Sequence, residues 1–391
     1  MSLAGRTAIA GIGSTEFSKD SGRSELRLAV EAILRALGDA GLRPAQVDGL
    51  VSFNMDNNEM TAVARNLGIP ELRLFAQTPW GGGGGCGTVA LAAAAITCGQ
   101  ADVVVCYRAM NERSQQRFGQ PPASTVPDGL VTGRALDNAW SRPFGMATAA
   151  AMMALSARRY MHEFDVTGED FGRVAVQSRD FAATNPAAWF YQRPITLDDH
   201  QSSRMIADPL RLFDCCQESD GAVALVVTSA ERAADLAQPT VLVRAAAQGA
   251  GSNHVQMASP YRDILTSAQE TEVVARQLWT QSRLTPENMD VAVIYDHFSF
   301  AVLMQLEALG FCKPGEAADL VRSGATGRGG SIPVNTNGGQ LGEAYIHGFN
   351  GVAEAVRQLR GTAVNQVDGA ANAVVTSGSH VPTSGLVLAR D

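Results

Sequence analysis

Nearly all cationic side chains of this chain are arginines, and the sequence contains only two lysines, Lys19 and Lys313. An enzyme that stabilises a carbanion through a Schiff base needs a lysine held in a desolvated pocket. Lys19 lies between Ser18 and Asp20, and Lys313 precedes Pro314-Gly315, so the sequence predicts that both occupy polar turns. We therefore expect no Schiff-base chemistry.

Metal chemistry is equally weakly indicated. The six histidines are dispersed, and no two of them have the spacing of a ligand pair on one helix. The six cysteines form neither a CxxC pair nor a disulfide framework, which is typical of proteins in a reducing cytoplasm. A carbanion in this protein would therefore have to be stabilised by hydrogen-bond donors rather than by an imine or a metal ion.

The composition excludes several broad classes of function. A chain of 391 residues is long enough for two domains or two fused halves, and 46% hydrophobic residues supply a large core. A charged fraction of only 18% suits a protein that buries further surface in an oligomer. The net charge of −8 argues against nucleic-acid and anionic-membrane binding. The N-terminus has no basic segment before a long apolar stretch, so we expect no signal peptide and a cytoplasmic location.

Strand and helix patterns alternate in the first third of the chain, which predicts a mainly parallel sheet covered by helices. Strands are expected at 7–12, 50–53 and 102–107. An amphipathic helix is expected at 25–40, and an alanine-rich helix follows the glycine run Gly81–Gly85 and ends at Gly99. From about 110 to 215 the pattern is looser and rich in proline, with one clear helix at 148–164. We expect this stretch to form an inserted loop domain over the site.

The second half of the chain repeats a pattern of the first. Leu42-Arg43-Pro44-Ala45-Gln46-Val47-Asp48 has a counterpart in Leu284-Thr285-Pro286-Glu287-Asn288-Met289-Asp290, and each follows an amphipathic helix and precedes an apolar strand. This indicates two duplicated halves. We predict an N-terminal half at 1–109 plus 217–235, a loop domain at 110–216 and a C-terminal half at 236–391.

Four motifs resemble those of the thiolase superfamily, most of all its sterol-carrier-protein type and the lipid-transfer-protein aldolases of actinobacterial steroid side-chain degradation. Gly87-Thr88-Val89-Ala90-Leu91 is similar to the family's Gly-Ser-Thr-Ala-Leu. Tyr295-Asp296-His297-Phe298 is similar to His-Asp-Cys-Phe. Asn335-Thr336-Asn337-Gly338-Gly339 is similar to the element before Gly-His-Pro, and 376–380 corresponds to the C-terminal Cys-x-Gly block. The resemblance covers nearly the whole chain.

The chain departs from the thiolase pattern wherever that pattern carries covalent chemistry. The register of Gly87–Leu91 puts Gly84 at the nucleophile position, and Cys86 falls two residues later. The family's activating histidine falls on Tyr345, and Tyr295 replaces a second reacting side chain. No cysteine follows Cys312, so the acid/base thiol is also missing. Condensation through an acyl-enzyme is therefore not expected unless a register shift makes Cys86 the nucleophile.

The resemblance implies a duplicated α/β thiolase fold in five layers, α-β-α-β-α, and an aldolase that cleaves a steroid β-hydroxyacyl-CoA to a 17-keto steroid and propionyl-CoA. A phenol can shuttle a proton or donate to an enolate, and backbone N–H groups near Gly84 and Gly85 can add donors. The implied catalytic residues are Tyr295 and Tyr345, with His297 and His347 as weaker candidates, and the implied substrate-binding residues are Gly84, Gly85, Cys86, Asp296, Gly338 and Gly339.

Less reactive roles stay open for several of these side chains. Each tyrosine can simply pack, His297 can be a structural histidine, and His347 can bond an adjacent carbonyl. Cys215-Cys216 is interpreted as a structural corner of the sheet. The resemblance further implies coenzyme A as part of the substrate with no covalently bound cofactor, a homodimer, and a small partner with an OB-fold and zinc ribbon. The rival functions are a thiolase or acyltransferase that uses Cys86, and a non-catalytic acyl-CoA or sterol carrier.

Overall fold

The computed structural model describes residues 3–79, 82–115, 117–119, 139, 141–257 and 261–391. The strands are β1 (Thr7–Ser14), β2 (Gly49–Phe53), β3 (Leu74–Thr78), β4 (Val103–Asn111), β5 (Met205–Ala207), β6 (Leu210–Arg211), β7 (Asp220–Ser229), β8 (Val241–Gly249), β9 (Val291–Val293), β10 (Asn372–Ser377) and β11 (Thr383–Arg390). The helices are α1 (Glu25–Ala40), α2 (Met60–Leu67), α3 (Gly85–Thr97), α5 (Ala149–Phe164), α6 (Gly168–Thr184), α7 (Leu197–Ser202), α8 (Ala230–Ala234), α9 (Gln269–Ser282), α10 (Ser299–Leu309), α11 (Ala317–Arg322), α12 (Gly339–Gly342) and α13 (Phe349–Arg360).

Nine strands form one sheet in the order β3-β2-β4-β7-β1-β8-β11-β10-β9. The expectation of a mainly parallel sheet is wrong. Among the described residues of this sheet, the ladders β2–β3, β2–β4 and β9–β10 are parallel, and the other ladders are antiparallel. The alternation of strands and helices predicted the parallel pairs, but β7, β8 and β11 pair antiparallel with their neighbours in the sheet. Only two residue pairs, Ala8–Leu242 and Ile9–Val241, join the two halves of the sheet through β1 and β8.

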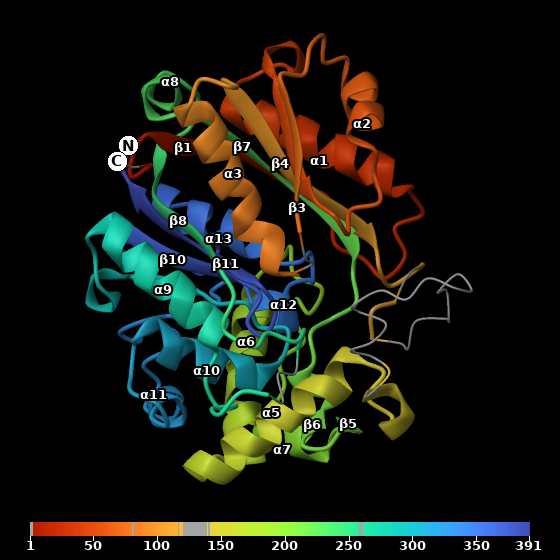
Figure 1. Cartoon of the computed structure of the whole chain (residues 1–391), viewed down its shortest axis with the longest axis vertical. Coiled ribbons are helices and arrows are strands. Elements are labelled where there is room, and N and C mark those ends of the chain that lie inside the picture. Colours follow the sequence, from red (N-terminus) through yellow and green to blue (C-terminus); the bar gives the residue numbers. More distant parts are fainter. Residues whose placement is uncertain (1–2, 80–81, 116, 120–138, 140, 258–260) are drawn as a thin grey trace.

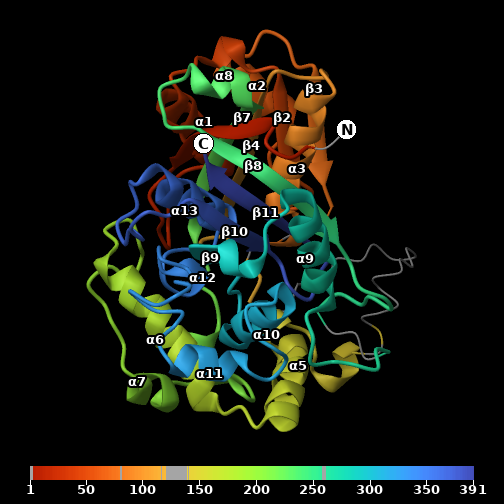
Figure 2. The ribbon, with the colours of Figure 1, turned by 90° about the vertical axis from the view of Figure 1, so that its left-hand side faces the viewer.

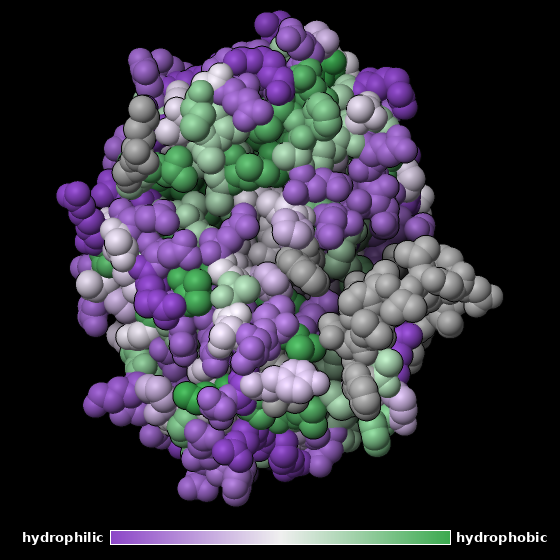
Figure 3. Space-filling model, in the orientation of Figure 1, coloured by the Kyte–Doolittle hydropathy of each residue, from purple (hydrophilic) through white to green (hydrophobic). Residues whose placement is uncertain are grey.

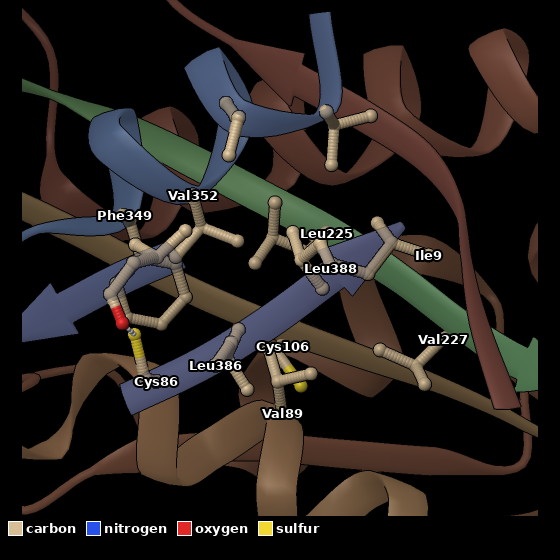
Figure 4. Packing of buried hydrophobic residues seen from close by; sticks show 14 of the residues in the cluster. Ile9, Cys86, Val89, Cys106, Leu225, Val227, Phe349, Val352, Leu386 and Leu388 are labelled. Atoms are coloured by element: carbon tan, nitrogen blue, oxygen red, sulfur yellow. Dashed lines mark hydrogen bonds between the residues drawn. The ribbon is translucent and has the colours of Figure 1, made fainter. Parts of the chain in front are cut away.

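The helices form three layers around the two halves of the sheet. Helix α1 covers β1, β4 and β7 of the N-terminal half, and α9 covers β8 and β11 of the C-terminal half. Helices α3 and α13 each contact strands of both halves, so they form the central layer (Figures 1 and 2). Figure 4 shows Val89 of α3 and Val352 of α13 packed with Leu386 and Leu388 of β11 in this central core. The five layers expected for the thiolase fold are present.

The predicted repeat corresponds to two equivalent corners. In the first, a short 3-10 helix at Pro44–Gln46 links α1 to β2, and in the second another at Pro286–Asn288 links α9 to β9. Proline opens both, since it has no N–H to leave unbonded at a helix start. The matching order of helix, corner and strand supports the predicted duplication.

The insertion between β4 and β7 contains more helix than the sequence indicated. Besides α5, it holds α6 and α7, and both views place these helices together at the end of the molecule away from the N-terminal half (Figures 1 and 2). A capping box between Thr167 and Asp170 starts α6. The prolines at 121, 122 and 127, which suggested a loose segment, lie outside the described residues. Within the described part of the chain, no helix is long and apolar enough to cross a membrane.

Candidate active site

Two buried tyrosines meet where the two halves join. Tyr295 follows the end of β9 and Tyr345 follows α12, and their hydroxyl oxygens lie 3.0 Å apart in a hydrogen bond. Backbone bonds fix both residues: the Tyr295 N–H donates to Thr376 Oγ1 at 3.0 Å, and the Tyr345 N–H donates to Ser219 Oγ at 3.1 Å. The two phenols predicted from separate motifs are therefore adjacent.

The surroundings keep both phenols protonated. Burial raises the pKa of Tyr295 and of Tyr345 well above the ordinary value of a phenol. Negative charge on Cys216 or Glu112 would raise both pKa values further, because these two side chains face the pair. A phenol pair in this state does not supply a free phenolate, but it can pass a proton along its hydrogen bond.

The glycine run forms the wall against which the phenols lie. A Cβ atom on Gly82 would lie 1.8 Å from the Tyr295 hydroxyl, so only glycine fits there. A Cβ atom on Gly85 would lie 2.7 Å from Ser377 Oγ. Gly348 lies against the ring of Tyr295 and has a φ of 84°. Close approach of the backbone to these side chains accounts for the glycines.

Cys86 lies in the first turn of α3 but not as an activated nucleophile. Its side chain is buried in the central core beside Phe349 (Figure 4), and its thiol accepts a hydrogen bond from Ser377 Oγ at 3.2 Å. Burial raises the pKa of the Cys86 thiol to about 12. A thiol with this pKa carries almost no thiolate at neutral pH, and the thiolate is the nucleophilic form.

Two amides of the α3 N-terminus are already occupied. The Cys86 N–H donates to Ser377 Oγ at 3.1 Å, and the Gly87 N–H donates to Ser384 Oγ at 2.8 Å. These serines come from β10 and β11 and anchor the start of α3. Gly84 is the N-cap residue of α3. The two occupied amides are therefore not free to bind a substrate oxyanion, and the roles expected of Gly84 and Gly85 stay predictions.

Asp296 supports the turn that leads to Tyr345. Its carboxylate accepts hydrogen bonds from the Gln340 N–H at 2.8 Å and the Leu341 N–H at 3.3 Å. A Cβ atom on Gly339 would lie 2.0 Å from the same carboxylate, and one on Gly338 would meet Ala182 at 2.6 Å. Burial raises the pKa of Asp296 to about 6. Contacts within the protein are enough to explain why Asp296, Gly338 and Gly339 occupy these positions. Their predicted role in substrate binding stays a prediction.

The two candidate histidines flank the phenols. The ring centroid of His297 lies 5.1 Å from that of Tyr295, and the centroid of His347 lies 4.9 Å from that of Tyr345. Burial lowers the pKa of His297 to about 3 and that of His347 well below its usual range. The expectation that His347 bonds an adjacent carbonyl is wrong, since its Nδ1 accepts a hydrogen bond from Arg108 Nε at 3.1 Å.

Lys19 is partly buried, which its predicted place in a polar turn did not indicate. Its ammonium donates to Gln217 Oε1 at 3.1 Å and to the Glu218 carbonyl at 2.6 Å, and it lies over the Trp189 ring. Burial lowers the pKa of Lys19 to about 8. Lys313, by contrast, is exposed.

Sequence reasoning missed Arg108 of β4 and Glu112, which follows β4, and it interpreted Cys216 only as part of a structural corner, whereas Cys216 and Glu112 act on the two tyrosines. Glu112 follows β4, is buried, and accepts the Ser219 N–H at 3.4 Å, and burial raises the pKa of its carboxyl well above the usual range. An acidic residue directly after an apolar strand is the signal that the sequence carried for Glu112. Among the described residues, no group of three or more acidic, histidine or cysteine side chains is arranged to hold a metal ion.

The fold and the motif positions define the class of protein. Residues 3–231 match the family described as thiolase, N-terminal domain, and residues 249–388 match the thiolase C-terminal domain-like family. The chain belongs to the thiolase superfamily.

Within that family, two full-length relatives are aldolases or lyases by name. The chain is 57% identical to a 17-hydroxy-3-oxo-4-pregnene-20-carboxyl-CoA lyase of Mycobacterium tuberculosis, over 99% of this chain and 100% of the relative. It is also 57% identical to a steroid side-chain-cleaving aldolase of Thermomonospora curvata, over 100% of this chain and 99% of the relative. The solved structure of an Ltp2-ChsH2(DUF35) aldolase superposes with a TM-score of 0.95 at 56% identity, covering 100% of this chain and 99% of that one.

Proposed function

We propose that this protein is an aldolase that cleaves the side chain of a steroid β-hydroxyacyl-CoA and releases a 17-keto steroid and propionyl-CoA. The observation that carries the proposal is the 3.0 Å hydrogen bond between the hydroxyls of Tyr295 and Tyr345, at positions where thiolases hold reacting side chains. The two relatives with 57% identity support the steroid acyl-CoA substrate. No cofactor is required beyond the coenzyme A that the substrate carries.

The reaction needs one proton to move from oxygen to carbon. The β-hydroxyl loses its proton, its oxygen forms the ketone, and the Cα–Cβ bond breaks with its electron pair entering the thioester enolate. The enolate then takes a proton at Cα. Two neutral phenols in a hydrogen bond can carry this proton in sequence: one phenol accepts from the β-hydroxyl while it donates to the second, which donates to Cα. The relay needs no free phenolate, which agrees with the raised pKa values of both tyrosines.

We assign Tyr345 to the hydroxyl side of the relay, because it replaces the activating histidine of the family, and Tyr295 to the enolate side. His297 lies next to Tyr295 and stays a weaker candidate for the same side. Cys86 lines the start of α3 and contributes shape rather than a covalent bond.

The experiment is a product assay with a matched set of thioesters. The purified chain, with its partner, is incubated with a steroid β-hydroxyacyl-CoA, and the ketone and propionyl-CoA are quantified by mass spectrometry. The same thioester without the β-hydroxyl serves as the control, because it cannot undergo retro-aldol cleavage. Release of both products only from the hydroxylated substrate supports the proposal, and absence of both contradicts it.

The two rival functions are distinguished when a β-keto thioester with free coenzyme A is added as a further substrate. A thiolase would cleave a β-keto thioester with free coenzyme A and form an acyl adduct on Cys86, whereas the raised pKa of this thiol disfavours such an adduct. A carrier would bind the thioester and return it unchanged. The buried phenol pair disfavours a carrier, since apolar packing alone does not require two hydroxyls within 3.0 Å.

We also propose a homodimer that binds a small OB-fold and zinc-ribbon protein, giving a heterotetramer in the cytoplasm that acts in cholesterol catabolism. The solved aldolase named above is a complex with ChsH2(DUF35), which supports a partner of this kind. Strand β3 pairs on one side only among the described residues, and its Phe75 is 68% exposed. Figure 3 shows hydrophobic residues gathered over the upper part of the face, where the N-terminal half lies. The free edge of β3 is our candidate for the dimer contact.

A further inference from the structure

The hydrogen bond between Arg108 and His347 fixes which nitrogen of the imidazole carries its proton. Arg108 Nε–H donates to His347 Nδ1 at 3.1 Å. A guanidinium is always protonated and has no acceptor, so Nδ1 must be the acceptor. A neutral imidazole with an accepting Nδ1 has its proton on Nε2. His347 is therefore a hydrogen-bond donor at Nε2.

Arg108 is itself held in one orientation. Its guanidinium pairs with Asp56 Oδ2 at 3.2 Å and donates to the Ala109 carbonyl at 2.7 Å. The side chains of Arg108 and Asp56 are 1% and 0% exposed. Asp56 is anchored in turn by the Ala109 N–H at 3.0 Å and the Asn58 N–H at 3.0 Å. A buried ion pair with this many fixed partners cannot turn away from the imidazole without leaving charge unpaired.

The donor of His347 has no acceptor of its own. Among the described residues, none accepts a hydrogen bond from Nε2, and Nε2 is not one of the fully buried polar atoms without a partner, although only 2% of the residue is exposed. The ring is lined by the aromatic rings of Phe53 at 5.2 Å, Phe118 at 5.4 Å and Tyr345 at 4.9 Å, measured between centroids. A donor that keeps some access beside the phenol pair and has no acceptor among the described residues is a candidate for a hydrogen bond that a ligand completes.

The backbone conformation of His347 is also strained, which is a second sign that this residue is held in place. His347 has a φ of 50°, a conformation that residues with a side chain rarely adopt, and Gly348 follows with a φ of 84°. Its carbonyl lies against the glycine wall, since a Cβ atom on Gly85 would be 2.9 Å from it. Strain of this kind persists where the surroundings hold a side chain in a functional position.

We propose that Nε2–H of His347, held in this tautomer by Arg108 and Asp56, donates to the thioester oxygen as the enolate forms. His347 is then a catalytic residue, and Arg108 and Asp56 are positioning residues. The assignment rests on the proposed function and adds the electrophile that the tyrosine relay lacks, because the amides of Cys86 and Gly87 are occupied by serines. Burial and the nearby charge of Arg108 lower the pKa of His347, so the imidazole stays neutral and keeps this tautomer.

A matched pair of substitutions tests the position of the donor. His347→Gln carries an amide N–H that reaches the Nε2 position, whereas the shorter His347→Asn reaches only the Nδ1 position. Asparagine tolerates the left-handed backbone at this position better than glutamine does. His347→Asn should therefore be the more stable variant, whereas His347→Gln should be the more active one. We expect kcat to fall about 10²–10³-fold in His347→Asn, as when an oxyanion donor is lost, and about 10-fold or less in His347→Gln, with KM little changed in both. Equal kcat values in the two variants would overturn the assignment.

The tautomer is tested in the unliganded protein, independently of activity. The ¹⁵N chemical shifts of the His347 ring, assigned by their absence in His347→Asn, should report a protonated Nε2 and an unprotonated Nδ1. The double variant Arg108→Met/Asp56→Asn removes both buried charges together. Without the Arg108 donor, the neutral ring of His347 can carry its proton on either nitrogen. The kcat of the double variant should fall about 10-fold or more near pH 8 and recover as the pH is lowered, because a protonated ring donates from both nitrogens, while the wild type stays flat between pH 6 and 8.

The outcomes separate this inference from the proposed function. An inactive wild-type protein contradicts the function but leaves the ring shifts as a test of the tautomer. An active wild type with a protonated Nδ1, or a double variant with wild-type kcat and a flat pH profile, contradicts this inference and leaves the aldolase proposal intact.

Discussion

Tyr295 and Tyr345 are fifty positions apart in the sequence, yet their hydroxyl oxygens share a hydrogen bond of 3.0 Å. Removing either hydroxyl breaks the proton relay, whereas phenylalanine keeps the ring packing. We expect Tyr295→Phe and Tyr345→Phe each to lower kcat/KM at least ~100-fold with little change in Tm, since loss of a positioned acid or base costs about 10²–10⁴-fold. Steady-state kinetics and thermal unfolding check this. Normally folded variants with near wild-type turnover would show that the tyrosines only pack.

Cys86→Ala should keep turnover within about 10-fold of the wild type, because retro-aldol cleavage forms no acyl-enzyme and the buried thiol has a pKa of about 12. Removing a buried sulfur leaves a small cavity, so a modest loss of stability, about 1 kcal/mol, is expected. Product assays and mass spectrometry of the intact protein with substrate measure both points. Complete loss of activity in a folded variant, or an acyl adduct on the wild-type Cys86, would support the thiolase alternative.

Lys19 is the lysine most able to form an imine, since burial lowers its pKa to about 8 and leaves much of the amine uncharged at that pH. We nevertheless expect borohydride with substrate to leave no adduct on Lys19 or Lys313. Lys19→Arg keeps a cation for the Glu218 carbonyl but cannot form an imine, so its turnover should stay within about 10-fold of the wild type. A reduced imine on Lys19, or an inactive but folded Lys19→Arg, would replace the tyrosine mechanism by a Schiff base.

Glu343 gives a pH dependence of stability with a defined sign. Burial raises its pKa to about 7, and Asn350 Nδ2 donates to its carboxylate at 2.9 Å. An acid whose pKa is raised by folding contributes stability that is complete below the unfolded value of 4.5 and is lost as the pH rises to about 7. Glutamine mimics the protonated acid. The Tm of Glu343→Gln relative to the wild type should therefore rise by about 2–5 °C between pH 5 and pH 8. A constant difference, measured by calorimetry, would contradict the raised pKa.

Phe75→Asp tests the free edge of β3 as the dimer contact. A charge at this exposed position should convert the proposed homodimer to monomer at micromolar concentration, because burying an unpaired carboxylate in an interface is costly. Val364→Asp is the matched control, since Val364 is also exposed, at 57% against 68% for Phe75, and lies elsewhere on the surface. Light scattering measures both. A wild-type monomer, or a Phe75→Asp protein that stays dimeric, would contradict this contact.

The sequence predicted the parts of the fold that have strong local signals. The helix expected at 25–40 has those bounds, because its apolar period and its Ser24 N-cap are local features. Motif positions likewise singled out Tyr295 and Tyr345, which lie side by side in the structure, while their catalytic role stays a prediction. Helix α6 was missed although Thr167 and Asp170 form a capping box, because nearby prolines suggested a loose segment.

The remaining site residues depend on distant contacts. In the sequence, Arg108 is simply the residue after an apolar strand pattern. Its place between Asp56 and His347 depends on the tertiary structure. The pKa shifts of Lys19 and Glu112 arise from burial by segments far away in the chain, which no local pattern reports. The antiparallel pairing of β7, β8 and β11 likewise depends on long-range order.

The contact between Gly82 and the Tyr295 hydroxyl limits how this site can change during evolution or engineering. Any side chain at position 82 would occupy the place of the phenol oxygen, and a Cβ atom at position 84 would lie 2.8 Å from Thr78 Oγ1 and 3.2 Å from Phe53 Cβ. A cysteine side chain at position 84 would therefore clash with Thr78 and Phe53. The wall and the phenols together leave no room for a nucleophilic cysteine at position 84, so introducing one requires several simultaneous replacements.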